Sequence, residues 1–470
     1  MARSLPDSLI TFRNSQGELV RATLMQLQRK SIVLEVYNPY SIVQVSEVLV
    51  DLTIQIKHQP VYTGRAVVIS MVNTGLTAVV SLTLIDEWQE LAEEKISAEQ
   101  VGQQVKEYIH YWQSTFQIRP SYQIIVNEMR AFLTDMSRWV EQIDLSTNLP
   151  RENKKLRHDY FLELATPFMQ RIGVYLTDLE GEAASVSNEL SIQHHAYAQS
   201  ALHPLLLRAP FVFRTYTKPL GYAGDYEMVN QLLADPRQGP NTYFQIINSA
   251  FLQAAVAQAH RNRIDLLVDF LKRLAVKAEQ NGKPIRVLNV GCGPAVEIQR
   301  FIQTYHRPEM LQFDLLDFSQ ETLDWTRSTL GKILNKIDRP IQVNYIHDSV
   351  HQLLKKSPHH HNLKRQYDAV YCAGLFDYLS DKVCTRLLAY FSACTHLEGH
   401  ILYTNVHESN PGKWGMQHLL EWYLIYRNES TMQSIAPESV RNLNVYVDST
   451  GVNVFAEYIN PAIQNMSGDV

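Results

Sequence analysis

Residues 284–297 read PIRVLNVGCGPAVE, and this stretch decides the fold of the second half of the chain. Residues 286–290 form a short apolar run, which is typical of a buried parallel strand. The glycines and the proline of residues 291–294 predict a tight turn, and an amphipathic helix is expected over 295–306. A strand, a glycine turn and a helix open a parallel α/β sheet, in which a nucleotide-like ligand binds beyond the carboxyl end of the strand. Taken alone, the same residues also fit a plain strand-to-helix turn.

Three further strands are predicted to follow in the order that such a sheet requires. Residues 312–318 (QFDLLDF) are the second strand, and Asp317 at its end is placed to accept hydrogen bonds from two ribose hydroxyls. The alternative makes Asp317 the cap of the next helix, with Ser319 as the rival cap. A third strand ends just before Asp348, a candidate partner for an adenine amino group. The fourth, over 367–374, ends in small residues that would form the floor of a site.

This order of motifs resembles the class I S-adenosylmethionine-dependent methyltransferases, over roughly residues 281–461. The resemblance implies a C-terminal α/β Rossmann-like domain with a seven-stranded sheet that closes in an antiparallel hairpin. It also implies S-adenosyl-L-methionine as the cofactor. The residues that it assigns to cofactor binding are Gly291, Cys292, Gly293, Glu297, Asp317, Phe318, Asp348, Ser349 and Ala373.

The composition is that of an ordinary globular protein, with 45% hydrophobic and 19% charged residues among 470. A chain of this length is expected to form two or three domains. Its net charge of −5 gives no support for a nucleic-acid partner. The four cysteines lack metal or redox spacing, so free thiols in a reducing cytoplasm are expected. No signal peptide, transmembrane segment or metal site is predicted.

Residues 1–88 are predicted to form a small β-barrel, because short strand-like runs are separated by turn residues. The predicted strands are 23–27, 31–37, 48–57, 64–72 and 77–84. The apolar segment 66–85 is long enough to span a membrane, but an Asn-Thr-Gly turn divides it into a hairpin. The layout resembles a PilZ domain, a barrel that binds cyclic di-GMP in other proteins. Arg29 and the turn at 70–75 match neither nucleotide motif of that family, so we expect a degenerate barrel used for packing or dimerisation.

Residues 89–240 are interpreted as a helical connector with a cap or lid, ahead of a methyltransferase domain at 241–470. Apolar residues recur every three or four positions over 98–116 and 120–143. The two stripes are Tyr108, Trp112 and Phe116, then Met129, Phe132, Met136 and Trp139. Such stripes usually form seams between helices, so a homodimer through the connector or the barrel is a candidate assembly.

Residues 211–229 (FVFRTYTKPLGYAGDYEMV) combine aromatic and charged side chains with glycine turns. This composition favours a mobile lid over a pocket, with Tyr222 and Tyr226 facing a bound sulfonium. The alternative is a solvated loop before a helix that begins near Tyr226.

Four motifs over about residues 202–458 indicate a particular group of methyltransferases. They are KPLGYAGDYEM, AHRNR, GCGPAVE and an expected EWYLIYR helix. These motifs resemble the methyltransferases of 3-hydroxypalmitic acid methyl ester biosynthesis, which make a bacterial signalling lipid. The resemblance implies methyl transfer to the carboxylate of a hydroxy fatty acid. A carboxylate is already ionised at pH 7, so it needs an orienting cation and apolar walls but no base. The predicted catalytic residues are Tyr222, Tyr226, Arg261 and Arg427, with Arg263, Lys218 and Trp422 as further candidates.

Two alternatives stay open at the level of the sequence. An amine or hydroxyl acceptor would require a general base, for which Asp225, His260 and Asp377 are candidates. The chain is otherwise a non-catalytic regulatory or scaffold protein that senses S-adenosylmethionine or a cyclic dinucleotide. Turnover of the cofactor separates an enzyme from a sensor, because both would bind it.

Overall fold

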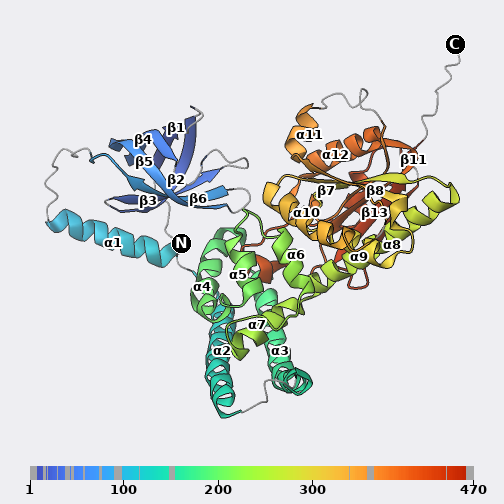
Figure 1. Cartoon of the computed structure of the whole chain (residues 1–470). Helices are drawn as coiled ribbons and strands as arrows, with labels where there is room; N and C mark the ends of the chain where they lie inside the picture. Colours follow the sequence, from blue (N-terminus) through green and yellow to red (C-terminus); the bar gives the residue numbers. More distant parts are fainter. Residues whose placement is uncertain are drawn as a thin grey trace. The chain divides into compact units, whose positions relative to one another are not determined.

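The computed structural model describes the chain apart from residues 1–7, 14–16, 18, 29, 38–42, 44–46, 57–58, 74–76, 89–97, 116, 148–153, 338, 357–364, 441 and 462–470. The chain divides into two compact units, which Figure 1 colours along the sequence. The first comprises Met1–Asp225, Gly239–Phe244 and Trp414–Trp422; the second comprises Tyr226–Gln238, Gln245–Lys413 and Tyr423–Val470. The domain boundaries expected at residues 88 and 240 stay predictions.

Six strands of the first unit close into an antiparallel barrel, which confirms the predicted all-β segment (Figure 1). Around the barrel they run β1 (Ser8–Arg13), β2 (Leu19–Leu27), β3 (Ser31–Tyr37), β6 (Thr77–Leu84), β5 (Gln59–Asn73) and β4 (Val48–Ile56). The predicted hairpin over 66–85 is the antiparallel pair β5 and β6. Strand β1 was not predicted, because only Ile10 and Phe12 mark its buried face. Arg29 and residues 74–76 lie outside the described residues, and the likeness to a PilZ domain stays a resemblance.

The helical part of the first unit is built around α2 (Pro120–Ser146), which packs against α3 (Lys154–Ala184) and α4 (Asn188–Leu206). The buried residues of α2 recur every three or four positions: Tyr122, Val126, Met129, Leu133, Met136 and Val140. Met129 and Met136 of the predicted stripe therefore lie in the seam, whereas Trp139 is 47% exposed. Helices α1 (Ala98–Thr115) and α5 (Pro210–Thr217) belong to the same unit.

Helix α13 (Lys413–Leu420) is held at both ends by these helices, although it lies far along the sequence. The Glu180 carboxylate accepts the N–H groups of Trp414 and Gly415, at 2.9 and 2.6 Å. At the other end, Lys218 donates to the Glu421 carbonyl oxygen at 3.0 Å. The expected EWYLIYR helix is wrong, because α13 ends at Leu420 and Glu421 has a left-handed φ of 50°. Lys218 is buried in this contact, and residues 218–225 form a short turn between α5 and α6 (Tyr226–Leu233).

The second unit contains a seven-stranded sheet in the order β12-β13-β11-β10-β7-β8-β9, which confirms the predicted fold class. The strands are β7 (Ile285–Val290), β8 (Leu311–Asp317), β9 (Val343–His347), β10 (Tyr367–Cys372), β11 (Thr395–Val406), β12 (Leu443–Val447) and β13 (Asn453–Ile459). All pairs are parallel except those that β13 makes with β11 and β12. Strand order reverses between β7 and β10, so their carboxyl ends form the switch point where such sheets bind ligands.

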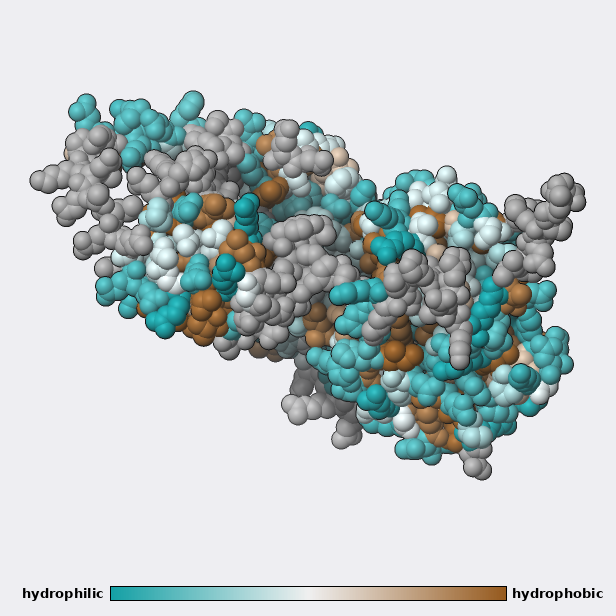
Figure 2. Space-filling model, turned by 90° about the horizontal axis from the view of Figure 1, so that it is seen from above, coloured by the Kyte–Doolittle hydropathy of each residue, from teal (hydrophilic) through white to brown (hydrophobic). Residues whose placement is uncertain are grey.

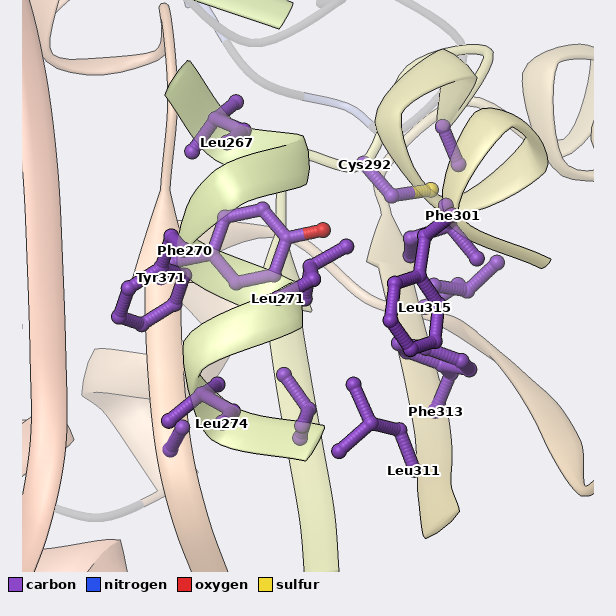
Figure 3. Close-up of a cluster of buried hydrophobic side chains, with 14 of the residues drawn as sticks. Leu267, Phe270, Leu271, Leu274, Cys292, Phe301, Leu311, Phe313, Leu315 and Tyr371 are labelled. Carbon is purple, nitrogen blue, oxygen red and sulfur yellow. The ribbon is translucent and has the colours of Figure 1, made fainter. Parts of the chain in front are cut away.

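Helices cover both faces of this sheet. On one face α8 (Ala255–Gln280), α9 (Val296–Thr304) and α10 (Gln320–Leu334) bury Leu267, Phe270, Leu271 and Leu274 against Leu311, Phe313 and Leu315 (Figure 3). The other face is covered by α11 (Val350–Lys356), α12 (Asp381–Cys394) and α14 (Glu429–Ser434). Helix α7 (Thr242–Leu252) and the short helical turns Pro308–Met310 and Phe376–Tyr378 complete the described elements.

The surface agrees with the composition. On the face drawn in Figure 2, brown apolar residues are scattered among teal polar ones, as is usual for globular proteins. Within the described part of the chain, no helix combines the length and the hydrophobicity of a membrane span.

Candidate active site

The glycine turn between β7 and α9 folds onto the end of β8. The main-chain N–H groups of Gly291 and Cys292 donate to the Leu316 carbonyl oxygen, at 2.8 and 3.0 Å. Gly291 and Gly293 have φ angles of 69° and 51°, in the left-handed region that glycine adopts without strain. The Cys292 sulfur packs in the core cluster of Figure 3, and burial raises the pKa of its thiol. A ligand at this turn would therefore meet backbone rather than the sulfur.

Asp317, at the end of β8, is tied to the same turn. Its carboxylate accepts the N–H groups of Gly293 and Ser319, at 3.0 and 2.9 Å. Ser319 caps α10, since its hydroxyl accepts the Thr322 N–H at 3.2 Å. Burial raises the pKa of the Asp317 carboxyl, and its backbone hydrogen bonds oppose that shift. An acid at the end of the strand beside the switch point, where it does not cap a helix, is suited to bind ribose hydroxyls.

The end of β9 lies beside Asp317. The Asp348 N–H donates to the Asp317 carbonyl oxygen at 3.1 Å, and the Asp348 carboxylate accepts the Ser349 N–H at 2.9 Å. Phe318 is 50% exposed at the same edge, whereas Ala373 is partly buried against the core at the end of β10. The structure thus brings four predicted cofactor residues, Asp317, Phe318, Asp348 and Ser349, to neighbouring strand ends.

Glu297 is buried in the first turn of α9. Its Oε1 accepts the Asn289 amide at 3.0 Å and the Tyr371 hydroxyl at 2.7 Å. Burial raises the pKa of this carboxyl, although both hydrogen bonds favour the charged form. Glu297 therefore ties α9 to β7 and β10 and positions the turn, while its cofactor-binding role stays a prediction.

Arg263 on α8 is the charged residue that stands out at these strand ends. The side chain is 8% exposed, and its Nη1 has no hydrogen-bond partner among the described residues. A Cβ on Gly374, the residue two positions after β10, would lie 3.1 Å from both Nη1 and Nη2 of Arg263. Burial lowers the pKa of the guanidinium, against the attraction of Asp377 and then Glu297. A buried cation with an unsatisfied donor marks a position for an anionic ligand group.

The two arginines predicted to be catalytic bind backbone and side-chain groups of the second unit. Arg261 donates to the carbonyl oxygens of Leu232 and Leu252, at 3.2 and 2.8 Å. The fully buried Arg427 donates to the carbonyl oxygens of Phe376 and Leu379 and to the side chains of Asn405 and Asp381. These contacts occupy both guanidinium groups.

The two predicted catalytic tyrosines fall in different units. The Tyr226 hydroxyl donates to Glu321 at 3.1 Å, and its ring lies 5.3 Å from that of Trp325, both on α10. Tyr222 belongs to the first unit and is half-buried in the turn before α6. Their roles at the methyl donor stay predictions.

The three candidate bases have distinct surroundings. Burial raises the pKa of Asp377 to about 6, and its Oδ1 accepts the Val406 N–H at 2.6 Å. Burial lowers the pKa of His260 to about 3, so its ring is neutral at pH 7. Asp225 forms a buried ion pair with Arg214 at 2.8 Å.

The sequence places Arg263 among several candidate cations, and a helical pattern distinguishes it. His260, Arg263, Ile264 and Leu267 follow the i, i+3, i+4, i+7 spacing of one helix face and share the buried face of α8, whereas Arg261 lies off that face. Gly374 carried no sequence signal for its contact with Arg263, because the two residues lie on separate elements.

No family model and no curated protein matches this sequence. Solved structures are similar at low identity, and three of them are described here. A Bordetella parapertussis protein described as a possible exported protein is 15% identical, with 74% of this chain and 100% of that chain covered and a TM-score of 0.41. Magnesium protoporphyrin IX methyltransferase (ChlM) from Synechocystis PCC 6803, with bound SAH, is 12% identical. The match covers 53% of this chain and 97% of that chain, with a TM-score of 0.36.

The N-methyltransferase NodS from Bradyrhizobium japonicum WM9 is 11% identical, with 44% of this chain and 98% of that chain covered and a TM-score of 0.29. Similarity of this size says nothing about substrate. The fold class therefore rests on the sheet order of this chain.

Proposed function

We propose that the chain is an S-adenosylmethionine-dependent methyltransferase whose cofactor lies at the carboxyl ends of β7, β8, β9 and β10. The observation that carries this proposal is Arg263, a buried guanidinium with an unsatisfied Nη1 beside Gly374. It lies on the helix that leads into β7, and Asp317 is bound to the glycine turn that follows that strand. A cation for a carboxylate and an acid for ribose hydroxyls match the two polar ends of this cofactor.

Each part of the cofactor has a proposed partner in the second unit. Asp317 accepts the ribose hydroxyls, and the exposed Phe318 ring and Asp348 bind the adenine. Arg263 binds the carboxylate of the methionine moiety. The sulfonium supplies an activated methyl group, and what this chain contributes is chiefly orientation and the exclusion of water.

The acceptor that we propose is the carboxylate of a hydroxy fatty acid or a similar small molecule, which would give a methyl ester. The choice of a carboxylate acceptor rests on the resemblance of the GYAGDYEM and AHRNR motifs. It also rests on chemistry, because a carboxylate is ionised at pH 7 and needs no general base. Tyr226 of the second unit would line the pocket, with its ring face toward the sulfonium. The same role for Tyr222 stays a prediction from the sequence. If the acceptor were an amine or hydroxyl, Asp377 would be the strongest candidate base, because burial raises its pKa to about 6, closer to neutral pH than an ordinary carboxyl.

The test is transfer of a labelled methyl group by the purified full-length chain. Long-chain 3-hydroxy fatty acids, primary amines and phenols are offered separately, and the products are then treated with mild alkali. A methyl ester releases labelled methanol in alkali, whereas a methylamine or an aryl ether keeps its label. Label that survives alkali would reject the carboxylate acceptor. Cofactor binding without transfer to any acceptor would favour the sensor.

A further inference from the structure

Helix α1 carries an apolar seam, of which Val101, Val105 and Tyr108 are exposed. Its seam residues alternate between spacings of three and four, as the a and d positions of a coiled coil do: Ala98, Val101, Val105, Tyr108 and Trp112. Val101 is 47% exposed, Val105 50% and Tyr108 62%. Tyr108 and Trp112 of the predicted stripe thus lie on α1, whereas Phe116 lies outside the described residues. The side chains of Val101, Val105 and Tyr108 are not buried against the described part of the chain.

The physics of an isolated helix makes this seam significant. An 18-residue helix is only marginally stable alone in water. Burying apolar side chains of this size removes hydrophobic surface from water, so covering the seam would stabilise α1. A 3.5-residue repeat fits a second helix that crosses at a shallow angle in a left-handed pair. The partner of the seam should therefore be a helix with the same spacing.

The charges of α1 indicate which helix that is. Glu99, Lys106 and Glu107 occupy outer positions, away from the seam. The positions that flank the seam carry no charge: Gly102, Gln104, Ile109 and Tyr111. Two copies of α1 can therefore meet without like charges facing each other. One lysine against two glutamates is also the wrong balance for a helix that binds an anionic membrane surface.

We propose that α1 pairs with α1 of a second copy of this chain, so that the protein dimerises through Val101, Val105 and Tyr108. Of the two candidate interfaces, the barrel and the helical connector, this proposal selects helix α1 of the connector. It is independent of the cofactor and the methyl acceptor.

The test compares two glutamates in the full-length chain, one at a seam position of α1 and one at an outer position. Val105→Glu puts a charge on the seam, and Gln113→Glu puts the same charge on an exposed outer position. Analytical ultracentrifugation over a concentration series should give a mass approaching twice 54.0 kDa for the unaltered chain. Val105→Glu should weaken dimerisation at least about tenfold, and Gln113→Glu by less than about threefold.

Cross-linking gives an independent measurement. The four native cysteines are buried, so Val105→Cys introduces a single exposed thiol. A parallel pair forms the Val105→Cys disulfide between copies, and an antiparallel pair forms it only when Val105→Cys is mixed with Tyr108→Cys. Either product supports the proposal.

Three results would overturn it. The chain could stay monomeric throughout the series, or its dimer could be insensitive to Val105→Glu. A third contrary result is a monomeric chain whose unfolding temperature is lowered by Val105→Glu, because the seam would then pack within one chain. Binding of a monomer to phosphatidylserine vesicles, lost in Val105→Glu, would instead assign α1 to membranes.

Discussion

Replacing Arg263 with Gln should weaken binding of S-adenosylhomocysteine but not of 5′-methylthioadenosine. The two ligands share adenosine and sulfur, and only the first carries the amino-acid carboxylate that we assign to Arg263. The guanidinium is 8% exposed, and its Nη1 has no other hydrogen-bond partner among the described residues. Loss of a buried, charge-assisted contact costs about 2–4 kcal/mol, which is roughly a 30- to 700-fold rise in Kd.

Titration calorimetry with both ligands measures this difference directly. Arg261→Gln is the matched control, because Arg261 lies on the same helix but donates to the Leu232 and Leu252 carbonyl oxygens. It should lower stability without distinguishing the ligands. If Arg263→Gln weakened both ligands equally, its effect would be structural. If S-adenosylhomocysteine bound Arg263→Gln as tightly as it binds the unaltered chain, the assignment of Arg263 to the carboxylate would be wrong.

Four further expectations follow from the same geometry. Asp317→Asn should weaken both ligands alike, by about 1–3 kcal/mol, because they share the ribose; calorimetry checks this. Gly374→Ala should reproduce the selectivity of Arg263→Gln in the same titrations, since its φ is 92° and its Cβ would lie 3.1 Å from the guanidinium. Tyr226→Phe removes the hydroxyl that donates to Glu321 but keeps the ring, so methyl transfer should fall far less than in Tyr226→Ala. Burial lowers the pKa of His418 to about 3, so the unfolded chain gains a proton near pH 6.5 that the folded chain excludes. Stability should therefore fall as pH drops below about 6.5, and His418→Gln should flatten that slope by up to ~1.4 kcal/mol per pH unit in urea unfolding.

The sheet could be predicted because each parallel strand carries its own signal. Val287, Leu288 and Val290 are buried on both faces of β7, so the strand appears as a continuous apolar run. Asp317 follows a run of the same kind in β8. Local patterns of this sort do not depend on distant parts of the chain.

What could not be predicted depended on contacts between distant segments. The EWYLIYR segment has the aromatic content of a buried helix, yet α13 ends at Leu420, where its last carbonyl groups bind side chains of the first unit, such as His203 and Gln199. Arg427 is a cation in an aromatic segment, which is typical of a site residue. Only the fold reveals that its N–H groups already donate to Phe376, Leu379, Asn405 and Asp381. Strand β1 alternates too briefly for its two buried residues to mark it.

Arg263 and Asp377 explain why a binding site is a better interpretation of these strand ends than a structural ion pair. If the two side chains served only to neutralise each other, their attraction would hold the pKa of Asp377 below its usual value. Burial instead raises that pKa to about 6, although the attraction of Arg263 and the hydrogen bond from Val406 oppose the shift. The unsatisfied Nη1 of Arg263 adds a further cost of about 1–3 kcal/mol. Such a group is unfavourable for stability but suited to attract a carboxylate, so at equal saturation S-adenosylhomocysteine should raise the unfolding temperature more than 5′-methylthioadenosine does.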